Sequence, residues 1–275
     1  MDSMKARLLT AAIGIPAAVA ALILGESMHW IMYLLVALIS PIMVFELLSA
    51  KKLHKNPFII IPCVLYSMLQ PVMILVNAGL LPLYVFGILM FFIMVAKSQK
   101  TNFFDVSFAL VGTVIISWGM TSILLLPPVY FNYYSFFFVV CLGIPWFADA
   151  GAYFAGVFFG AHKLCPNVSP NKTVEGFIGG IVIGTISSLI IGFIYSFIYS
   201  NAEFNYGVML IIGTLSSVIS VLGDLTFSMI KRQCKIKDYG SIFPGHGGFL
   251  DRFDSVLFTA PLVYFIGSYF SIFIV

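Results

Sequence analysis

Apolar runs of about 20 residues recur along the whole chain, and no other feature restricts its possible folds as much. A helix needs roughly 20 residues to cross about 30 Å of hydrocarbon. Of the 275 residues, 61% are hydrophobic and 9% are charged, whereas soluble domains are about 45–50% apolar and about 25% charged. The sequence therefore predicts an all-α, polytopic integral membrane protein. We expect nine membrane-spanning helices, with centres in residues 8–25, 29–48, 58–77, 79–96, 105–126, 133–150, 177–199, 206–230 and 255–274.

The basic residues fall on alternate loops of this nine-helix arrangement. All 14 Lys and Arg residues lie at the N-terminus, in loops near 51–55, 97–100 and 163–172, or between Lys231 and Arg252. Because cytoplasmic loops are rich in Lys and Arg, we expect the N-terminus and every basic loop to be cytosolic. The net charge of +3 then belongs to a face suited to anionic lipid or phosphorylated ligands. Without a basic soluble domain, we expect no nucleic-acid partner.

The chemistry is expected in the second part of the chain. Residues 1–104 hold apolar spans and short basic loops, whereas residues 105–275 contain two long polar segments, 149–176 and 231–253. Both segments are predicted to be cytosolic, so they can meet at one site. Glu46 lies one turn from Lys51 near a helix end, and we interpret the two as an interfacial ion pair rather than a functional site.

Glycines recur at four-residue spacing on both sides of the first polar segment. Gly156 and Gly160 precede it, and Gly176, Gly180 and Gly184 follow it. Such small-residue faces let helices approach closely, so we expect them to pack helices rather than bind a ligand.

A polar stripe runs along the eighth predicted helix. Asp224, Ser228 and Lys231 are spaced i, i+4 and i+7, which places them on one helical face. Asp224 is expected roughly 10 Å below the helix end at Lys231, from the rise of about 1.5 Å per residue. A carboxylate at that depth usually faces a partner, a cavity or a metal. The alternative is a structural Asp–Lys tether between helices.

Two further aspartates stand at the predicted start of the ninth helix. Asp251, Asp254 and Ser255 are spaced i, i+3 and i+4, so we expect both carboxylates on one helical turn, opposite Asp224. Clusters of oxygen ligands suit Mg²⁺, which binds through a few carboxylates together with substrate phosphates. Helix capping and pairing with the helix dipole is the alternative for one of these aspartates.

A glycine-rich stretch, FPGHGGF, separates these two helices. Gly245, Gly247 and Gly248 permit unusual backbone conformations and allow N–H groups to approach an anion. A tight turn is the default interpretation, since neither known phosphate-loop pattern is present. His246 is interpreted as a donor to a phosphate oxygen, with a general base and a structural histidine as alternatives. Neighbouring cations favour a phosphate cradle: Lys231, Arg232, Lys235, Lys237 and Arg252.

The first polar segment contains a predicted helix start. Ser169 is expected to be the N-cap and Pro170 the first helical residue. The free N–H groups there, with Lys172 and Thr173, would face anions; a plain cap is the alternative. Asp149, at the end of the sixth span, is a candidate for metal or nucleotide binding, or a simple cap.

These residues resemble the signature of a known family, the CDP-diacylglycerol synthases, also called phosphatidate cytidylyltransferases. Within 27 residues, this chain matches all 13 fixed positions of the signature: Ser228, Lys231, Arg232, Lys237, Asp238, Gly240, Pro244, His246, Gly247, Gly248, Asp251, Arg252 and Asp254. An upstream stretch is similar through Asp149, Gly151, Ala152, Tyr153, Gly156, Gly160, Lys163, Ser169, Pro170, Lys172, Thr173, Glu175 and Gly176. The sequence departs from the common pattern at Val157, Asn171 and Val174.

The resemblance implies a membrane enzyme, expected as a homodimer in the bacterial plasma (inner) membrane, with its active site facing the cytosol. It would convert CTP and phosphatidate to CDP-diacylglycerol and pyrophosphate, using Mg²⁺ and K⁺ as a second cation. It assigns catalytic roles to Asp224, Asp251, Lys231 and His246, and metal binding to Asp224, Asp251 and Asp254. It assigns substrate binding to Ser228, Arg232, Lys237, Arg252, Ser169, Lys172, Thr173, Gly247 and Gly248.

Two other functions remain open from the residues alone. A CTP-dependent lipid-alcohol kinase of the polyprenol type would present similar charged loops but would transfer the γ-phosphoryl group. A membrane transporter would use Asp224 and Glu46 along an ion path, although no related halves are visible.

Overall fold

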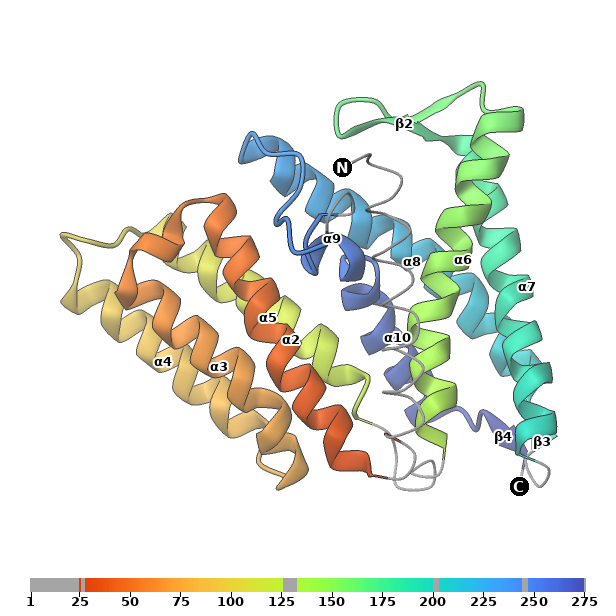
Figure 1. Cartoon of the computed structure of the whole chain (residues 1–275), viewed down its shortest axis with the longest axis horizontal. Helices are drawn as coiled ribbons and strands as arrows, with labels where there is room; N and C mark the ends of the chain where they lie inside the picture. The colour runs from red at the N-terminus through yellow and green to blue at the C-terminus, as the bar shows by residue number, and fades with distance from the viewer. Residues whose placement is uncertain (1–24, 26–27, 126–132, 200–202, 244–246, 275) are drawn as a thin grey trace. The chain divides into compact units, whose positions relative to one another are not determined.

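The computed structural model describes residue 25 and residues 28–125, 133–199, 203–243 and 247–274, and these are mostly helical (Figure 1). This confirms the predicted all-α class of membrane protein. Six described helices are long and apolar enough to cross a membrane. They are α2 (His29–Ala50), α3 (Pro57–Leu75), α5 (Phe103–Ser122), α6 (Tyr134–Phe159), α7 (Val174–Ile198) and α8 (Tyr206–Gln233).

Two shorter apolar helices correspond to the fourth and ninth predicted spans. They are α4 (Leu80–Ala96) and α10 (Val256–Tyr269). The ninth span, predicted over 255–274, is too long, because Phe270 adopts an extended backbone that ends α10. The following strand β4 (Phe273–Ile274) pairs antiparallel with β3 (Glu203–Phe204). The first predicted span, 8–25, lies almost entirely outside the described residues.

The chain folds into two compact units that are interleaved in sequence. Unit 1 comprises residues 1–125 and 233–253, and unit 2 comprises residues 126–232 and 254–275. A segment of the second polar stretch thus packs with the N-terminal helices. From its sequence, we divided the chain between residues 104 and 105 into a part without expected chemistry and a part with it. That division stays a prediction.

Unit 1 is built from α2, α3, α4 and α5, which lie side by side in Figure 1. Fully buried apolar side chains such as Met43, Leu47 and Ile116 form its core. Two of the basic loops, near 51–55 and 97–100, lie at the same end of these helices. Asn56 caps α3 by accepting from the Phe58 N–H at 3.1 Å, and its side-chain amide donates to the Lys100 carbonyl at 3.0 Å.

In unit 2, α6 and α7 pack closely through small residues. A Cβ on Gly180 would lie 2.9 Å from the Ala148 carbonyl oxygen, and one on Gly176 would lie 2.7 Å from that of Ala152. The predicted packing role of these glycines is therefore confirmed. A hairpin of β1 (Lys163–Cys165) and β2 (Ser169–Thr173) connects the two helices.

The two polar segments are shorter as loops than the sequence predicted. In the segment 149–176, α6 continues to Phe159 and α7 starts at Val174. In the segment 231–253, α8 continues to Gln233, and a short helix, α9 (Leu250–Phe253), closes the loop.

Candidate functional site

In unit 2, the predicted polar stripe on α8 is present. The Ser228 hydroxyl donates to Asp224 Oδ1 at 3.1 Å, one helical turn away. Both side chains are partly buried, and Asp224 retains 24% exposure. The i, i+4 spacing read from the sequence thus produces a hydroxyl–carboxylate pair on one face of the helix.

The second carboxylate oxygen of Asp224 is paired with Lys172. Lys172 Nζ contacts Asp224 Oδ2, with the two side chains 23% and 24% exposed. The pair joins α8 to β2. An Asp–Lys tether, the alternative considered above, is therefore present, but its lysine lies on a strand and not on a helix. Lys172 was predicted to bind substrate, and it now stands beside the predicted metal ligand.

The two predicted polar segments also approach each other at the end of α8. Arg232 Nε donates to the Val168 carbonyl at 3.5 Å, which connects α8 to the β1–β2 turn. Together with the Lys172–Asp224 pair, this contact brings three predicted site residues of unit 2 to the same end of the helices.

Asp254 lies in unit 2 between α9 and α10 and is buried, with 8% exposure. Its Oδ1 accepts a hydrogen bond from the Ser255 N–H at 2.8 Å. The pKa of Asp254 is raised to about 7, chiefly by burial and also by the negative charge of Asp224, while Lys231 partly opposes the increase. Asp149, exposed on α6, adds a smaller repulsion. Asp149, Asp224 and Asp254 are thus close enough to interact electrostatically.

The predicted helix start at Ser169 and Pro170 is wrong. Both residues lie in β2, and the N-cap of α7 is Thr173. Thr173 is extended (φ −121°, ψ 156°), and its hydroxyl accepts from the Gly176 N–H at 3.1 Å. Because the hairpin register pairs Thr173 with Lys163, the strand persists to the cap itself. The first N–H groups of α7 therefore follow Thr173 and not Ser169.

In unit 1, Asp251 organises the glycine-rich loop. Its Oδ2 accepts from the Tyr239 N–H at 2.8 Å and the Gly248 N–H at 3.0 Å. Gly247 has φ +87°, and a Cβ there would lie 2.7 Å from Asp251 Oδ2. Phe243 N–H also donates to the Gly247 carbonyl at 2.9 Å. Gly247 is therefore required both by its left-handed backbone and by the adjacent carboxylate.

The predicted shared helical turn for Asp251 and Asp254 is wrong. Asp251 lies in α9, which ends at Phe253, and Asp254 precedes α10, which begins at Val256. A turn at Asp254 and Ser255 separates the two helices, and the Asp254 carboxylate accepts from the Ser255 N–H within that turn. The metal role predicted for Asp251 stays a prediction.

Sequence reasoning missed the role of Glu46. Its carboxylate accepts from the N–H groups of Phe249 at 3.2 Å and Leu250 at 2.8 Å, and the side chain is only 5% exposed. Lys51, its predicted partner, pairs instead with Asp105 at 2.6 Å. The ion-pair prediction was wrong because both Glu46 oxygens are used by the start of α9. The sequence signal for this role was the position of a carboxylate inside an apolar run, where it needs hydrogen-bond donors.

The remaining predicted residues are less constrained. Lys237 and Arg252 are exposed in unit 1, which leaves their charges accessible to ligands. His246 lies outside the described residues. Lys231 is partly exposed at the end of α8.

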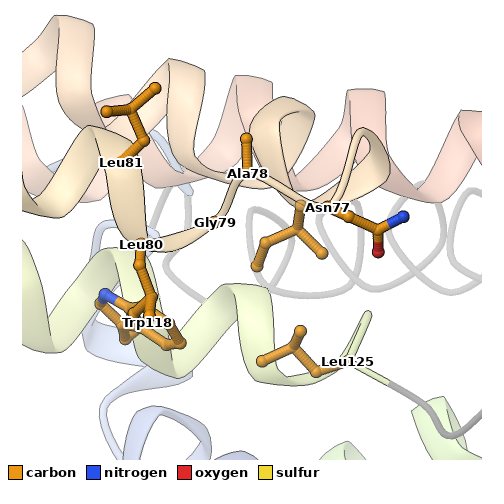
Figure 2. Close-up of a pocket in the computed structure, with 8 residues that line it drawn as sticks. Asn77, Ala78, Gly79, Leu80, Leu81, Trp118 and Leu125 are labelled. Atoms are coloured by element: carbon orange, nitrogen blue, oxygen red, sulfur yellow. The ribbon is translucent and has the colours of Figure 1, made fainter.

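A pocket of about 290 Å³ in unit 1 carries none of the predicted site residues. It lies at the α3–α4 turn, where Asn77, Gly79 and Trp118 surround it (Figure 2). Its lining contains no charged side chain, so it offers nothing to hold a phosphate.

Comparison with known proteins decides the family. The sequence pattern of the cytidylyltransferase family matches residues 5–270. The chain belongs to this cytidylyltransferase family. The match runs through the signature residues of both units.

Curated proteins named phosphatidate cytidylyltransferase resemble this cytidylyltransferase-family chain. One from Bacillus subtilis (strain 168) is 42% identical over 137 residues, 50% of this chain and 49% of the relative. One from Staphylococcus saprophyticus is 36% identical over 171 residues, 62% of each chain. One from Staphylococcus aureus (strain COL) is 33% identical over 171 residues, again 62% of each. The matched part thus spans about half to three fifths of these relatives' lengths.

Proposed function

We propose that this chain is a phosphatidate cytidylyltransferase, which transfers the cytidylyl group of CTP to phosphatidate and releases pyrophosphate. The observation that carries the proposal is the charged cluster of Asp224, Ser228, Lys172 and Asp254 at one end of apolar helices. Family membership and the names of the relatives support the same activity.

The placement of this cluster suits one lipid and one soluble substrate. A lipid phosphate comes from the bilayer and a triphosphate from water, and both are strongly anionic. Cations at helix ends lower the repulsion between them, since Coulomb energies are large where little water is present. Lys172, Lys231 and Arg232 would neutralise the phosphates in unit 2, and Lys237 and Arg252 carry exposed charges in unit 1.

The reaction requires little from a general base. An oxygen of the phosphatidate phosphomonoester attacks the α-phosphorus of CTP, forming the new P–O bond. The bond between that phosphorus and the bridging oxygen breaks, and pyrophosphate carries away the electron pair. Because the second pKa of a phosphomonoester is about 6, the attacking oxygen is already ionised near neutral pH. Positioning and charge neutralisation are therefore the main tasks of the side chains.

The carboxylates of unit 2 fit a magnesium ion. Among the described residues, no group of three or more His, Cys, Asp or Glu side chains is placed to hold a metal. Mg²⁺, however, usually binds through one or two carboxylates and completes its shell with water and substrate phosphates. The mutually repelling pair Asp224 and Asp254 fits that requirement, and the two would hold the ion. The ion would supply neutralisation of phosphate charge.

The second cation, the oligomeric state and the membrane location are part of the same proposal. We propose K⁺ as a second cation and a homodimer as the assembly. The proposed location is the bacterial inner membrane, with the active site on the cytosolic side, because the basic loops would face the cytosol.

Labelled CTP tests the function directly. Purified protein is given phosphatidate, Mg²⁺ and CTP labelled on either the α- or the γ-phosphate. We expect the α-label in the lipid and the γ-label in pyrophosphate. Transfer of the γ-label to a lipid alcohol would indicate the kinase instead. The proposal would be contradicted if neither an α-labelled lipid nor pyrophosphate were formed.

A further inference from the structure

Unit 1 contains a second cationic feature, distant in sequence from every predicted site residue. A pocket of about 450 Å³ is formed where the loop after α2 meets the loop after α4. We call it the lysine pocket, and its lining residues are Lys52, Leu53, Lys55, Asn56, Pro57, Phe58 and Lys100.

The lysine pocket combines cations with an apolar wall. Lys97 Nζ and Lys100 Nζ lie 5.0 Å and 5.8 Å from the centre of the Phe58 ring, within reach of cation–π attraction. Lys52, Lys55 and Lys100 are exposed, whereas Leu53 is buried. Such a surface presents ammonium groups above an apolar floor, which suits a ligand with a charged head and an apolar body.

The cations of the pocket are not neutralised by described carboxylates. Within the described residues, the ion pair of this region is Lys51 with Asp105, and no described carboxylate pairs with Lys52, Lys55 or Lys100. Lys52 also occupies the left-handed region, with φ 61°, where a lysine is less favourable than glycine or asparagine. The pocket thus presents three exposed ammonium groups that an anion can contact.

The position of the pocket identifies the source of the anion. It lies at the ends of α2 and α4 and the starts of α3 and α5, all apolar helices. The 19 residues of α3 correspond to about 28 Å, close to the thickness of the hydrocarbon core. If α3 crosses the bilayer, the lysine pocket lies at the depth of the lipid headgroups; the uncharged pocket in Figure 2 lies at the other end of α3.

We propose that the lysine pocket binds the phosphate of an anionic phospholipid, separately from the reaction centre. The lysines would contact the headgroup phosphate, and Leu53, Pro57 and Phe58 would contact its glycerol and upper acyl carbons. The inference does not rest on the proposed function, because a phosphodiester lipid is not consumed by cytidylyl transfer.

Binding of short-chain phosphatidylglycerol to the full chain in zwitterionic detergent tests the proposal, with native mass spectrometry as readout. Phosphatidylcholine of equal chain length is the headgroup control, and inorganic phosphate is the soluble arm. We expect binding of phosphatidylglycerol that neither other probe reproduces or displaces at equal concentration. Displacement by inorganic phosphate would overturn the lipid assignment in favour of a soluble anion.

Variants locate the binding. The triple substitution Lys52→Gln, Lys55→Gln and Lys100→Gln should weaken phosphatidylglycerol binding about tenfold or more, because the cations that contact the headgroup phosphate are removed. The corresponding triple change to Arg keeps the charge and should stay near the parent affinity. Lys163→Gln, an exposed lysine of β1, is the control. Parent-like affinity in the triple Gln variant, with the protein folded, would overturn the proposal.

Discussion

Glu46 Oε2 accepts a hydrogen bond from the backbone N–H of Leu250 at 2.8 Å, although the two residues are 204 positions apart. Oε1 of the same carboxylate accepts from Phe249, so one buried side chain holds the start of α9. The loop that α9 closes carries much of the family signature. Glu46 thus connects the apolar N-terminal helices to that signature inside unit 1.

Glu46→Ala should reduce both stability and turnover. Each buried donor left without an acceptor costs about 1–3 kcal/mol, and the loop would lose its anchor on α2. Glu46→Gln, which retains one carbonyl acceptor, should be less severe. Thermal unfolding and cytidylyl transfer measure the two effects, with Glu203→Gln, an exposed glutamate of β3, as control. A Glu46→Ala protein with parent unfolding and turnover would contradict this role.

Asp224→Asn should lower turnover by about 100-fold or more while the protein stays folded, because the carboxylate proposed to hold the magnesium ion is lost. The matched control is Asp105→Asn, which removes the carboxylate of the other lysine pair, Lys51–Asp105. It should keep turnover within about twofold, because Asp105 lies outside the proposed site and partly exposed ion pairs contribute about 0–1 kcal/mol.

The double variant Lys172→Met with Asp224→Asn separates a tether from a functional carboxylate. If the pair only joined α8 to β2, removing both charges together would restore turnover. We expect no recovery, and steady-state kinetics in detergent decides between the two outcomes.

Gly247→Ala should destabilise the signature loop. The left-handed backbone costs a non-glycine residue about 1–2 kcal/mol, and the added methyl would press on Asp251. Gly87→Ala is the matched control, because nothing lies within 4 Å of a Cβ at that position of α4. The control should unfold at the parent temperature or above it, since alanine favours helix. Equal behaviour of the two variants in thermal unfolding would argue against a constrained Gly247.

The metal-free protein should become less stable as the pH rises from about 3.8 to about 7, and its stability should then level off. Asp254 has a pKa near 7 when folded, against 3.8 in an unperturbed aspartate. The folded state therefore retains a proton that the unfolded chain loses first, and stability from that proton disappears as Asp254 ionises. Mg²⁺ competes with the proton, so it should raise the unfolding temperature more at high than at low pH. Scanning calorimetry with and without Mg²⁺ tests this, and Asp254→Asn should remove both effects.

Thr173→Ala should destabilise the protein by about 1 kcal/mol through loss of the α7 N-cap. Thr173→Ser keeps the capping hydroxyl and should restore most of the loss. Ser169→Ala, in β2, should have little effect on thermal unfolding. A larger loss at Ser169 than at Thr173 would contradict the cap assignment.

Spacing along single helices was the most predictable property. The i, i+4 relation of Asp224 and Ser228 needed only helical geometry, and the structure contains their hydrogen bond. The packing role of the α6 and α7 glycines followed in the same way. The apolar runs likewise located eight helices, because hydrophobic length dominates in a membrane.

The approach of the two polar segments was predicted, but other relations between distant segments were not. Nothing in the sequence near Glu46 indicates that its partners are the N–H groups of α9. The cap at Thr173 was misplaced because Ser169-Pro170 satisfies the local rule for a helix start, while the hairpin with β1 extends the strand four residues further. Tertiary pairing overrode local preference in both cases.

The Glu46 contact also sets an order of events during biosynthesis. At about 5–20 residues per second, the ribosome needs roughly 10–40 s to extend from Glu46 to Leu250. During that interval a carboxylate within an apolar helix lacks the two donors that hold it in the finished protein. We therefore expect α2 to insert stably only after α9 has been made. Truncation before α9 should leave the N-terminal helices poorly retained in the membrane, even though every one of them has been synthesised.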